Sequence, residues 1–173
     1  MSIIITKVTI ADLPTLIRIS RETFADTFSA ENTAADLTLF LNTTYSNAQL
    51  QRELKTNGTS FWFVKVNGKL AGYLKLNINS AQSEKRSHDT LEIERIYILP
   101  AFKRQGLGTR LLGFAQSEAI KQGKSRIWLG VWEHNEPAKK FYQKQGFQPI
   151  GDHIFQLGSD PQRDILMEKL ISD

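Results

Sequence analysis

The stretch from Thr90 to Leu112 limits the possible folds more than any other part of this chain. Its first half alternates with a period of two, as in a β-strand, with Glu92, Glu94, Ile96 and Ile98 alternating with Leu91, Ile93, Arg95 and Tyr97. Unless a bulge intervenes, the two glutamates share one face of this strand. Pro100 ends the pattern. Lys103 to Gly108 follows, and Thr109 to Ala119 repeats apolar residues at helical spacing. The sequence therefore predicts a strand, a glycine loop and a helix in succession.

The glycine loop is suited to an anion. The first N–H groups of a helix have no partner within the helix and carry the positive end of its dipole, so they attract phosphate. Gly106 and Gly108 let the backbone approach a ligand closely. Lys103, Arg104 and Arg110 add cations around the same point. These features predict a pyrophosphate ligand in preference to a neutral one.

Two other phosphate-binding motifs do not fit the spacing. A dinucleotide-binding loop needs G-x-G-x-x-G directly after its strand, but Leu111 stands at the third glycine position and residues 99–105 intervene. The run GKS at residues 123–125 resembles the end of a Walker A motif, yet Glu118 occupies the position of its first glycine. We interpret that run as a turn.

A third pattern resembles the GNAT N-acetyltransferases. Its first part is Ile96-x-Ile98-x-Pro100, then Lys103, where that family usually has Arg or Gln, then Gly106-x-Gly108. Its second part follows N-x-x-A-x-x-F-Y-x-x-x-G-F and consists of Asn135, Ala138, Phe141, Tyr142, Gly146 and Phe147. The resemblance implies an acetyl-CoA-dependent N-acetyltransferase with a mixed α/β fold, in which helices flank a mostly antiparallel central sheet.

The same resemblance implies where the cofactor binds. The strand that ends at Ile98 and the strand from Ile127 to Val131 would splay apart, with coenzyme A between them. The pantetheine arm would pair with the backbone of the first strand, and the pyrophosphate would lie on the loop. Asn135 could instead only cap a helix, and Lys139 could lie on a solvated face. The residues assigned to acetyl-CoA are Ile96, Tyr97, Ile98, Lys103, Arg104, Gln105, Gly106, Leu107, Gly108, Thr109, Asn135, Lys139 and Tyr142.

Acetyl transfer to an amine needs a proton acceptor, because an alkyl ammonium has a pKa of about 10. The resemblance makes Glu94 the first candidate base, acting directly or through water, and Glu92 the second. The alternative for both is a salt-bridged or solvent-facing carboxylate beside Arg95 or Lys75. Tyr142 is the candidate acid that protonates the departing thiolate, with plain aromatic packing as its alternative.

Further matches resemble the PaiA-type bacterial spermidine/spermine acetyltransferases. They are residues 72–77, 94–98, 128–133 and 155–158, with Asp164 and Met167. This resemblance implies a polyamine acceptor, which needs carboxylates and aromatic faces. The predicted acceptor residues are Glu22, Phe24, Asp26, Phe28, Glu31 and Asp36. The alternatives are a protein N-terminal or lysine acetyltransferase and a non-catalytic regulator that binds acetyl-CoA or DNA.

Length and composition fit a single domain over residues 1–173, which the resemblance identifies as an N-acetyltransferase domain. Hydrophobic residues make up 40% of the chain, and the net charge of +4 suits a polyanionic cofactor. We do not expect nucleic acid as a partner, because no basic run is interleaved with aromatics.

There is no cysteine, and the three histidines lack metal-ligand spacing, so we predict no metal. The short Ile3 to Ile5 run predicts a strand rather than a membrane span, and we expect a cytoplasmic protein. The oligomeric state stays open, a homodimer included.

The remaining elements are predicted from periodicity and turn signals. Helices are expected from Leu13 to Phe28 after Asp12, from Ala34 to Leu41, from Ala48 to Lys55 after Asn47, and from Pro137 towards Gly146. Strands are expected at residues 60–66 and 69–78, joined by a tight Asn67-Gly68 turn, and at residues 152–157 and 164–170. Residues 79–89 form a polar, mobile loop in this prediction.

Overall fold

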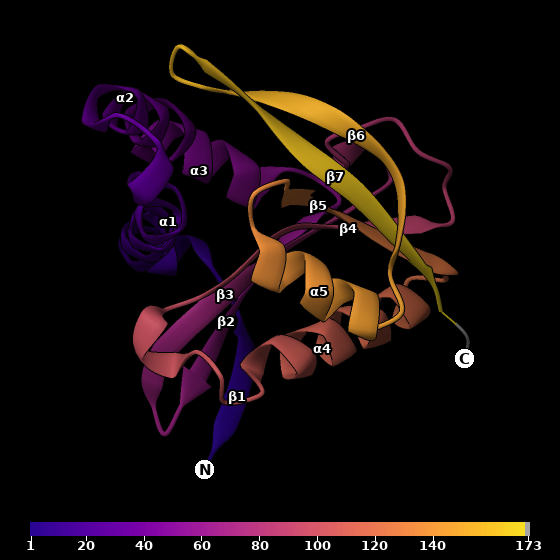
Figure 1. The fold of residues 1–173 in the computed structure, drawn as a ribbon. Coiled ribbons are helices and arrows are strands. Elements are labelled where there is room, and N and C mark those ends of the chain that lie inside the picture. Colours follow the sequence, from indigo (N-terminus) through magenta and orange to yellow (C-terminus); the bar gives the residue numbers. More distant parts are fainter. Residues whose placement is uncertain (172–173) are drawn as a thin grey trace.

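The computed structural model describes residues 1–171 and shows a seven-stranded sheet with helices on both faces (Figure 1). In spatial order the strands are β1 (Ile3–Lys7), β2 (Thr59–Val66), β3 (Lys69–Ile78), β4 (Thr90–Ile98), β5 (Arg126–Trp132), β7 (Asp160–Leu170) and β6 (Gln148–Leu157). Within this described range, only β4 and β5 pair in parallel. The predicted mixed, mostly antiparallel sheet is confirmed.

Five α-helices cover the sheet and divide its hydrophobic residues into two cores. On one side are α1 (Leu13–Phe28), α2 (Ala34–Thr44) and α3 (Asn47–Lys55), and on the other are α4 (Leu107–Lys121) and α5 (Glu136–Lys144). The first core includes Leu16, Phe24 and Leu50, and the second includes Leu111, Leu112 and Ile127. Two predicted caps differ from the structure. Ser46, not Asn47, caps α3 by accepting from the Gln49 N–H at 3.2 Å, and the Asp12 carboxylate accepts from the Thr9 N–H at 2.9 Å.

Two hairpins frame the sheet. Asn67 and Gly68 have φ angles of 50° and 80°, and positive values at both central residues suit the right-handed twist of the strands they join. The β6–β7 connection is tighter than predicted, because only Gly158 and Ser159 lie between the strands. Its tip reaches over α2 in Figure 1, where Asp36 accepts from the Ser159 N–H at 2.9 Å.

A β-bulge in β4 corrects the predicted alternation of that strand. Arg95 pairs with Lys75 and Ile93 pairs with Leu76, so Glu94 is an extra residue opposite β3. The side chains therefore change faces at this point, and those packed in the core beneath α4 are Leu91, Ile93, Ile96 and Ile98. A strict period of two would have placed the glutamates with Ile96 and Ile98.

The parallel pair β4 and β5 separates after four residues. Thr90 to Ile93 pairs with Arg126 to Leu129, and β5 continues to Trp132 paired only with β7. From Glu94 onward, the edge of β4 that faces β5 has no strand partner. The predicted splay is confirmed, and it leaves backbone N–H and C=O groups available to a ligand.

Candidate active site

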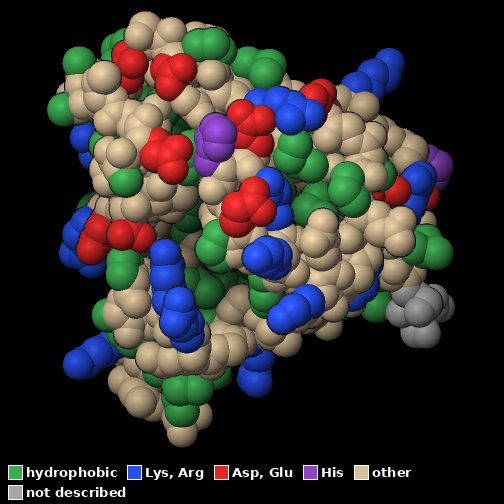
Figure 2. Space-filling view, in the orientation of Figure 1, with side chains coloured by type: hydrophobic (Ala, Val, Ile, Leu, Met, Phe, Trp, Pro, Cys, Tyr) green, Lys and Arg blue, Asp and Glu red, His purple; other side chains and the backbone are tan. Residues whose placement is uncertain are grey.

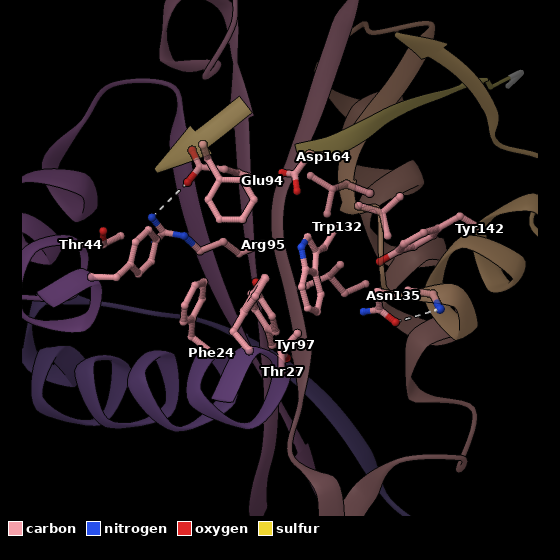
Figure 3. A pocket seen from close by; sticks show the side chains of 18 of the residues that line it. Phe24, Thr27, Thr44, Glu94, Arg95, Tyr97, Trp132, Asn135, Tyr142 and Asp164 are labelled. Atoms are coloured by element: carbon pink, nitrogen blue, oxygen red, sulfur yellow. Dashed lines mark hydrogen bonds and ion pairs between the residues drawn. The ribbon is translucent and has the colours of Figure 1, made fainter. Parts of the chain in front are cut away.

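A cavity of about 230 Å³ lies where β4 and β5 separate. One wall is formed by residues 93–97 of β4, and the opposite wall by residues 130–132 of β5 (Figure 3). Its aromatic lining comes mostly from elements distant in sequence and consists of Phe24, Phe28, Phe40, Tyr45, Tyr97, Trp132, Tyr142 and Phe155. A ligand here would meet aromatic side chains on several sides and polar groups at one end.

Glu94 belongs to a cluster of four charged side chains at that end. Lys75 Nζ lies 2.7 Å from Glu53 Oε1 and 2.9 Å from Glu94 Oε2. Arg95 Nη2 lies 3.1 Å from Glu94 Oε2, and its Nη1 lies 2.9 Å from Glu53 Oε1. The Lys75 side chain is only 6% exposed. A second, polar cavity of about 420 Å³ lies beside the cluster and shares Glu94, Arg95 and Thr44 with the first.

The neighbouring cations decide the charge of Glu94. Burial alone would raise the pKa of this carboxyl group, but Arg95 and Lys75 outweigh burial, and the net effect is a lowered pKa. The same balance lowers the pKa of Glu53. Glu94 is therefore ionised at neutral pH and can accept a proton. Glu94 is salt-bridged, as the alternative interpretation of the sequence predicted, and it also lines the cavity.

Glu92 has a different environment, although it lies only two residues away. Its side chain is buried and lines neither of these cavities. It accepts from Asn77 Nδ2 at 2.9 Å and from the Ser83 N–H at 2.7 Å. Burial, followed by the charge of Glu94, raises the pKa of Glu92. The segment after β3, expected to be a mobile loop, is thus joined to β4 through Ser83.

Tyr142 enters the cavity from α5, on the side opposite Glu94 (Figure 3). Burial raises the pKa of its phenol, so the hydroxyl keeps its proton at neutral pH. Asn135 also lines the cavity and at the same time caps α5 by accepting from the Ala138 N–H at 3.3 Å. Lys139 lies outside the cavity and forms an ion pair with Glu136 at 2.6 Å.

The two glycines of the loop are required for different reasons. Gly106 has a φ of 79°, in the left-handed region that favours glycine, while a Cβ atom there would meet nothing within 4 Å. At Gly108 a Cβ atom would lie 3.1 Å from Phe141 Cζ, so this glycine lets α4 pack closely on α5. Leu107 is buried in the core and offers a ligand only its backbone. The exposed residues of the loop are Lys103, Arg104, Gln105, Gly106 and Thr109.

The surface around the opening is divided by charge. Figure 2 shows a hollow in this face, with basic side chains on both sides of its lower part and acidic side chains above it. One basic residue of the loop, Lys103, lies 3.3 Å from Asp26 of α1, so the predicted phosphate-binding and acceptor-binding regions are in contact.

The predicted acceptor residues separate into two groups. Phe24 and Phe28 line the cavity, stacked with ring centroids 4.3 Å apart. The acidic members Glu22, Asp26, Glu31 and Asp36 do not line it.

The sequence prediction missed Glu53, Thr44 and Asp164 as residues around the two cavities, and it considered Lys75 and Arg95 only as ion-pair partners. Among residues 1–171, no three His, Asp or Glu side chains cluster as metal ligands, and no helix in that range could span a membrane.

Together, the open parallel pair, the cavity and the basic glycine loop define an α/β protein whose sheet opens beside a loop suited to an anion. The sequence profile of the acetyltransferase (GNAT) family matches residues 18–147. An uncharacterized N-acetyltransferase of Lactobacillus delbrueckii subsp. lactis is 47% identical over 167 residues, which cover 96% of each chain. The chain belongs to the acetyltransferase (GNAT) family. It is an N-acetyltransferase, and acetyl-CoA is its cofactor.

Two matches from Thermoplasma acidophilum, one to a solved structure and one to a sequence, extend the comparison. The crystal structure of its PaiA N-acetyltransferase in complex with coenzyme A matches with a TM-score of 0.80 and 26% identity, over 99% of this chain and 100% of that one. Its spermidine N(1)-acetyltransferase is 27% identical over 152 residues, which cover 86% of this chain and 89% of the other. The GNAT fold predicted from the sequence is thereby confirmed.

Proposed function

We propose that this enzyme transfers the acetyl group of acetyl-CoA directly to a primary amine of a polyamine, with both bound at once. The observation that carries the proposal is the position of Glu94. Its carboxylate is ionised at neutral pH and lines an aromatic cavity where β4 and β5 separate. An ammonium group is attracted to such a carboxylate, and its alkyl chain packs well on aromatic faces.

The residues present fit acetyl-CoA. The unpaired edge of β4 from Glu94 to Ile98 offers backbone groups to the pantetheine amides, as an added strand would use them. Exposed Lys103 and Arg104 and the start of α4 suit the phosphates. Gly106 and Gly108 maintain the loop geometry described above. Asn135 can use its free amide N–H groups towards the cavity while its oxygen caps α5.

When bound, acetyl-CoA supplies the acetyl group as a thioester, and transfer to an ammonium releases protons and a thiolate. Glu94 accepts a proton from the acceptor nitrogen, directly or through water, which frees the lone pair for attack. The Tyr142 hydroxyl, held protonated by burial, would donate to the sulfur that leaves, and the second proton lost by the acceptor nitrogen would restore this hydroxyl, while Glu94 returns its proton to solvent. We assign the base to Glu94 rather than Glu92, because only Glu94 lines the cavity.

The polyamine class is supported by two observations. A relative named spermidine N(1)-acetyltransferase is similar over most of both chains. The cavity walls also combine aromatic faces with the carboxylates of Glu94 and Asp164.

The test is thiol release from acetyl-CoA with purified protein and a panel of acceptors. Spermidine, spermine and linear diamines should be acetylated with a much higher kcat/KM than peptides with free N-termini or lysines. Preference for a peptide would reject the polyamine and leave the acetyltransferase assignment in place. Mass spectrometry of the product identifies the nitrogen that carries the acetyl group.

A further inference from the structure

A second carboxylate faces the cavity from the wall opposite Glu94. Asp164 of β7 lines the cavity, and Figure 3 shows it at the same end as Glu94 but on the far side. Asp164 Oδ2 lies 3.1 Å from His153 Nε2 of β6. On the other side of the imidazole ring, His153 Nδ1 lies 3.4 Å from Glu84 Oε1, in the segment before β4. The acid and base chemistry proposed above uses none of these three residues.

The space for the Asp164 carboxylate depends on a glycine in the neighbouring strand. A Cβ atom at Gly130 would lie 3.1 Å from Asp164 Oδ2 and 3.4 Å from Asp164 Cβ. Because Gly130 does not adopt a positive φ, its backbone conformation does not demand glycine. The missing side chain leaves room for the carboxylate beside the cavity. Gly130 and Asp164 thus form one feature of the wall.

We propose that Asp164 is a second ammonium-binding residue of the acceptor site, so that an alkyl diammonium binds with one nitrogen towards Glu94 and another towards Asp164. Phe28, Trp132 and Phe155 lie near this wall and supply apolar surface for the carbon chain. The proposal rests on the proposed function and deepens it, because it explains how the enzyme would distinguish diamines from monoamines.

The protonation state of His153 changes the net charge of the cavity wall at Asp164. The hydrogen bond with Asp164 raises the pKa of His153, burial opposes it, and the charges of Asp164 and Glu84 add to the rise. These two carboxylates, from β7 and from the segment before β4, are the charged groups that face the imidazole in the described chain. A protonated His153 offsets one negative charge. Diamine affinity should therefore increase as pH rises through the His153 titration.

The experiment measures binding of spermidine, 1,4-diaminobutane and butylamine to the CoA-loaded protein by calorimetry. Asp164→Asn should weaken binding of both polyvalent amines about tenfold, the range for a hydrogen bond to a charged group, while butylamine and CoA affinities change little. Asp152→Asn is the matched control, since Asp152 lies on the same hairpin but pairs with Arg163 on the surface. The control should bind like wild type.

Two further variants test the same wall. Gly130→Ala should weaken diamine binding by displacing the carboxylate, and His153→Gln should remove the pH dependence of diamine affinity. Equal affinities of Asp164→Asn and Asp152→Asn for diamines would overturn the proposal, as would a wild-type protein that binds no diamine. If polyamines are still acetylated in either case, the proposed function survives. If neither polyamines nor diamines are acetylated, the proposed function itself fails, and this result is distinct from a failure of the Asp164 proposal alone.

Discussion

The carboxylate end of the cavity and the glycine loop lie at opposite ends of one short segment, Glu94 to Gly108, yet they depend on different interactions. At the carboxylate end, Glu94 depends on Lys75 from β3, and Lys75 in turn contacts Glu53 from α3. The loop depends on a positive φ at Gly106 and on local backbone geometry. The end proposed to accept the proton is thus determined by contacts distant in sequence, whereas the end proposed to bind phosphate depends more on its own backbone.

The largest effect on stability is expected at Lys75. Lys75→Met removes one of the two cations that Glu53 and Glu94 share in a buried site, and Arg95 remains as the other, so the change should cost up to about 3–5 kcal/mol in free energy of unfolding. Lys121→Met is the control, because Lys121 is 70% exposed and pairs with Glu118 one helical turn away. It should change stability by less than about 0.5 kcal/mol. Similar urea midpoints for both variants would mean that the cluster does not support the carboxylate end.

Tyr142→Phe should affect catalysis without affecting cofactor binding. Losing a hydrogen bond to a developing thiolate should lower kcat about tenfold to a hundredfold, while acetyl-CoA affinity stays within about twofold. Tyr73→Phe serves as the control and should keep its kcat, because this buried tyrosine packs against Tyr97 without lining the cavity. Parallel losses in kcat and acetyl-CoA affinity for Tyr142→Phe would count against its role as an acid.

The glycine loop should respond in the opposite way. Gly108→Val must displace Phe141 and should weaken acetyl-CoA binding about tenfold or more, because overpacking costs about 1–3 kcal/mol. Gly106→Ala meets no side chain, so its smaller effect, about 1 kcal/mol, reflects backbone strain alone. Gly113 lies in the same helix, and a Cβ atom added there would meet nothing within 4 Å. The Gly113→Val variant should therefore bind acetyl-CoA normally. Calorimetry measures the acetyl-CoA affinity of all three variants. Equal affinities would contradict the different roles assigned to these glycines.

The smallest effect concerns acid stability. The folded-state pKa values of Glu53 and Glu94 are lowered, so these carboxylates stabilise the fold above their unfolded values of about 4.3, and the contribution is lost as pH falls through the folded values. The stability advantage of wild type over Glu94→Gln should therefore shrink between pH 5 and pH 3, as measured by urea unfolding. An advantage that grows on acidification would reverse the sign.

Local spacing in the sequence predicted the strand, the glycine loop and the helix that follows it, because each depends on residues within one element and the next. The splayed strands and the role of Tyr142 were expected only from the resemblance to the GNAT family. The bulge at Glu94 leaves no periodic signal, and a strict alternation therefore misplaced Ile96 and Ile98 relative to the glutamates. Glu53 and Asp164 could not be selected either. Their distances from the reacting end depend on how α3 and β7 pack on the sheet.

The most direct test of the account compares Glu94→Gln with Glu92→Gln, measuring turnover and acetyl-CoA affinity on the same preparations. Both variants should bind acetyl-CoA as wild type does. Glu94→Gln should lose about a hundredfold to ten thousandfold in kcat, the usual contribution of a general base, while Glu92→Gln keeps most of its turnover. Wild-type turnover in Glu94→Gln, or an equal loss in Glu92→Gln, would contradict the assignment of the proton acceptor to the cavity carboxylate.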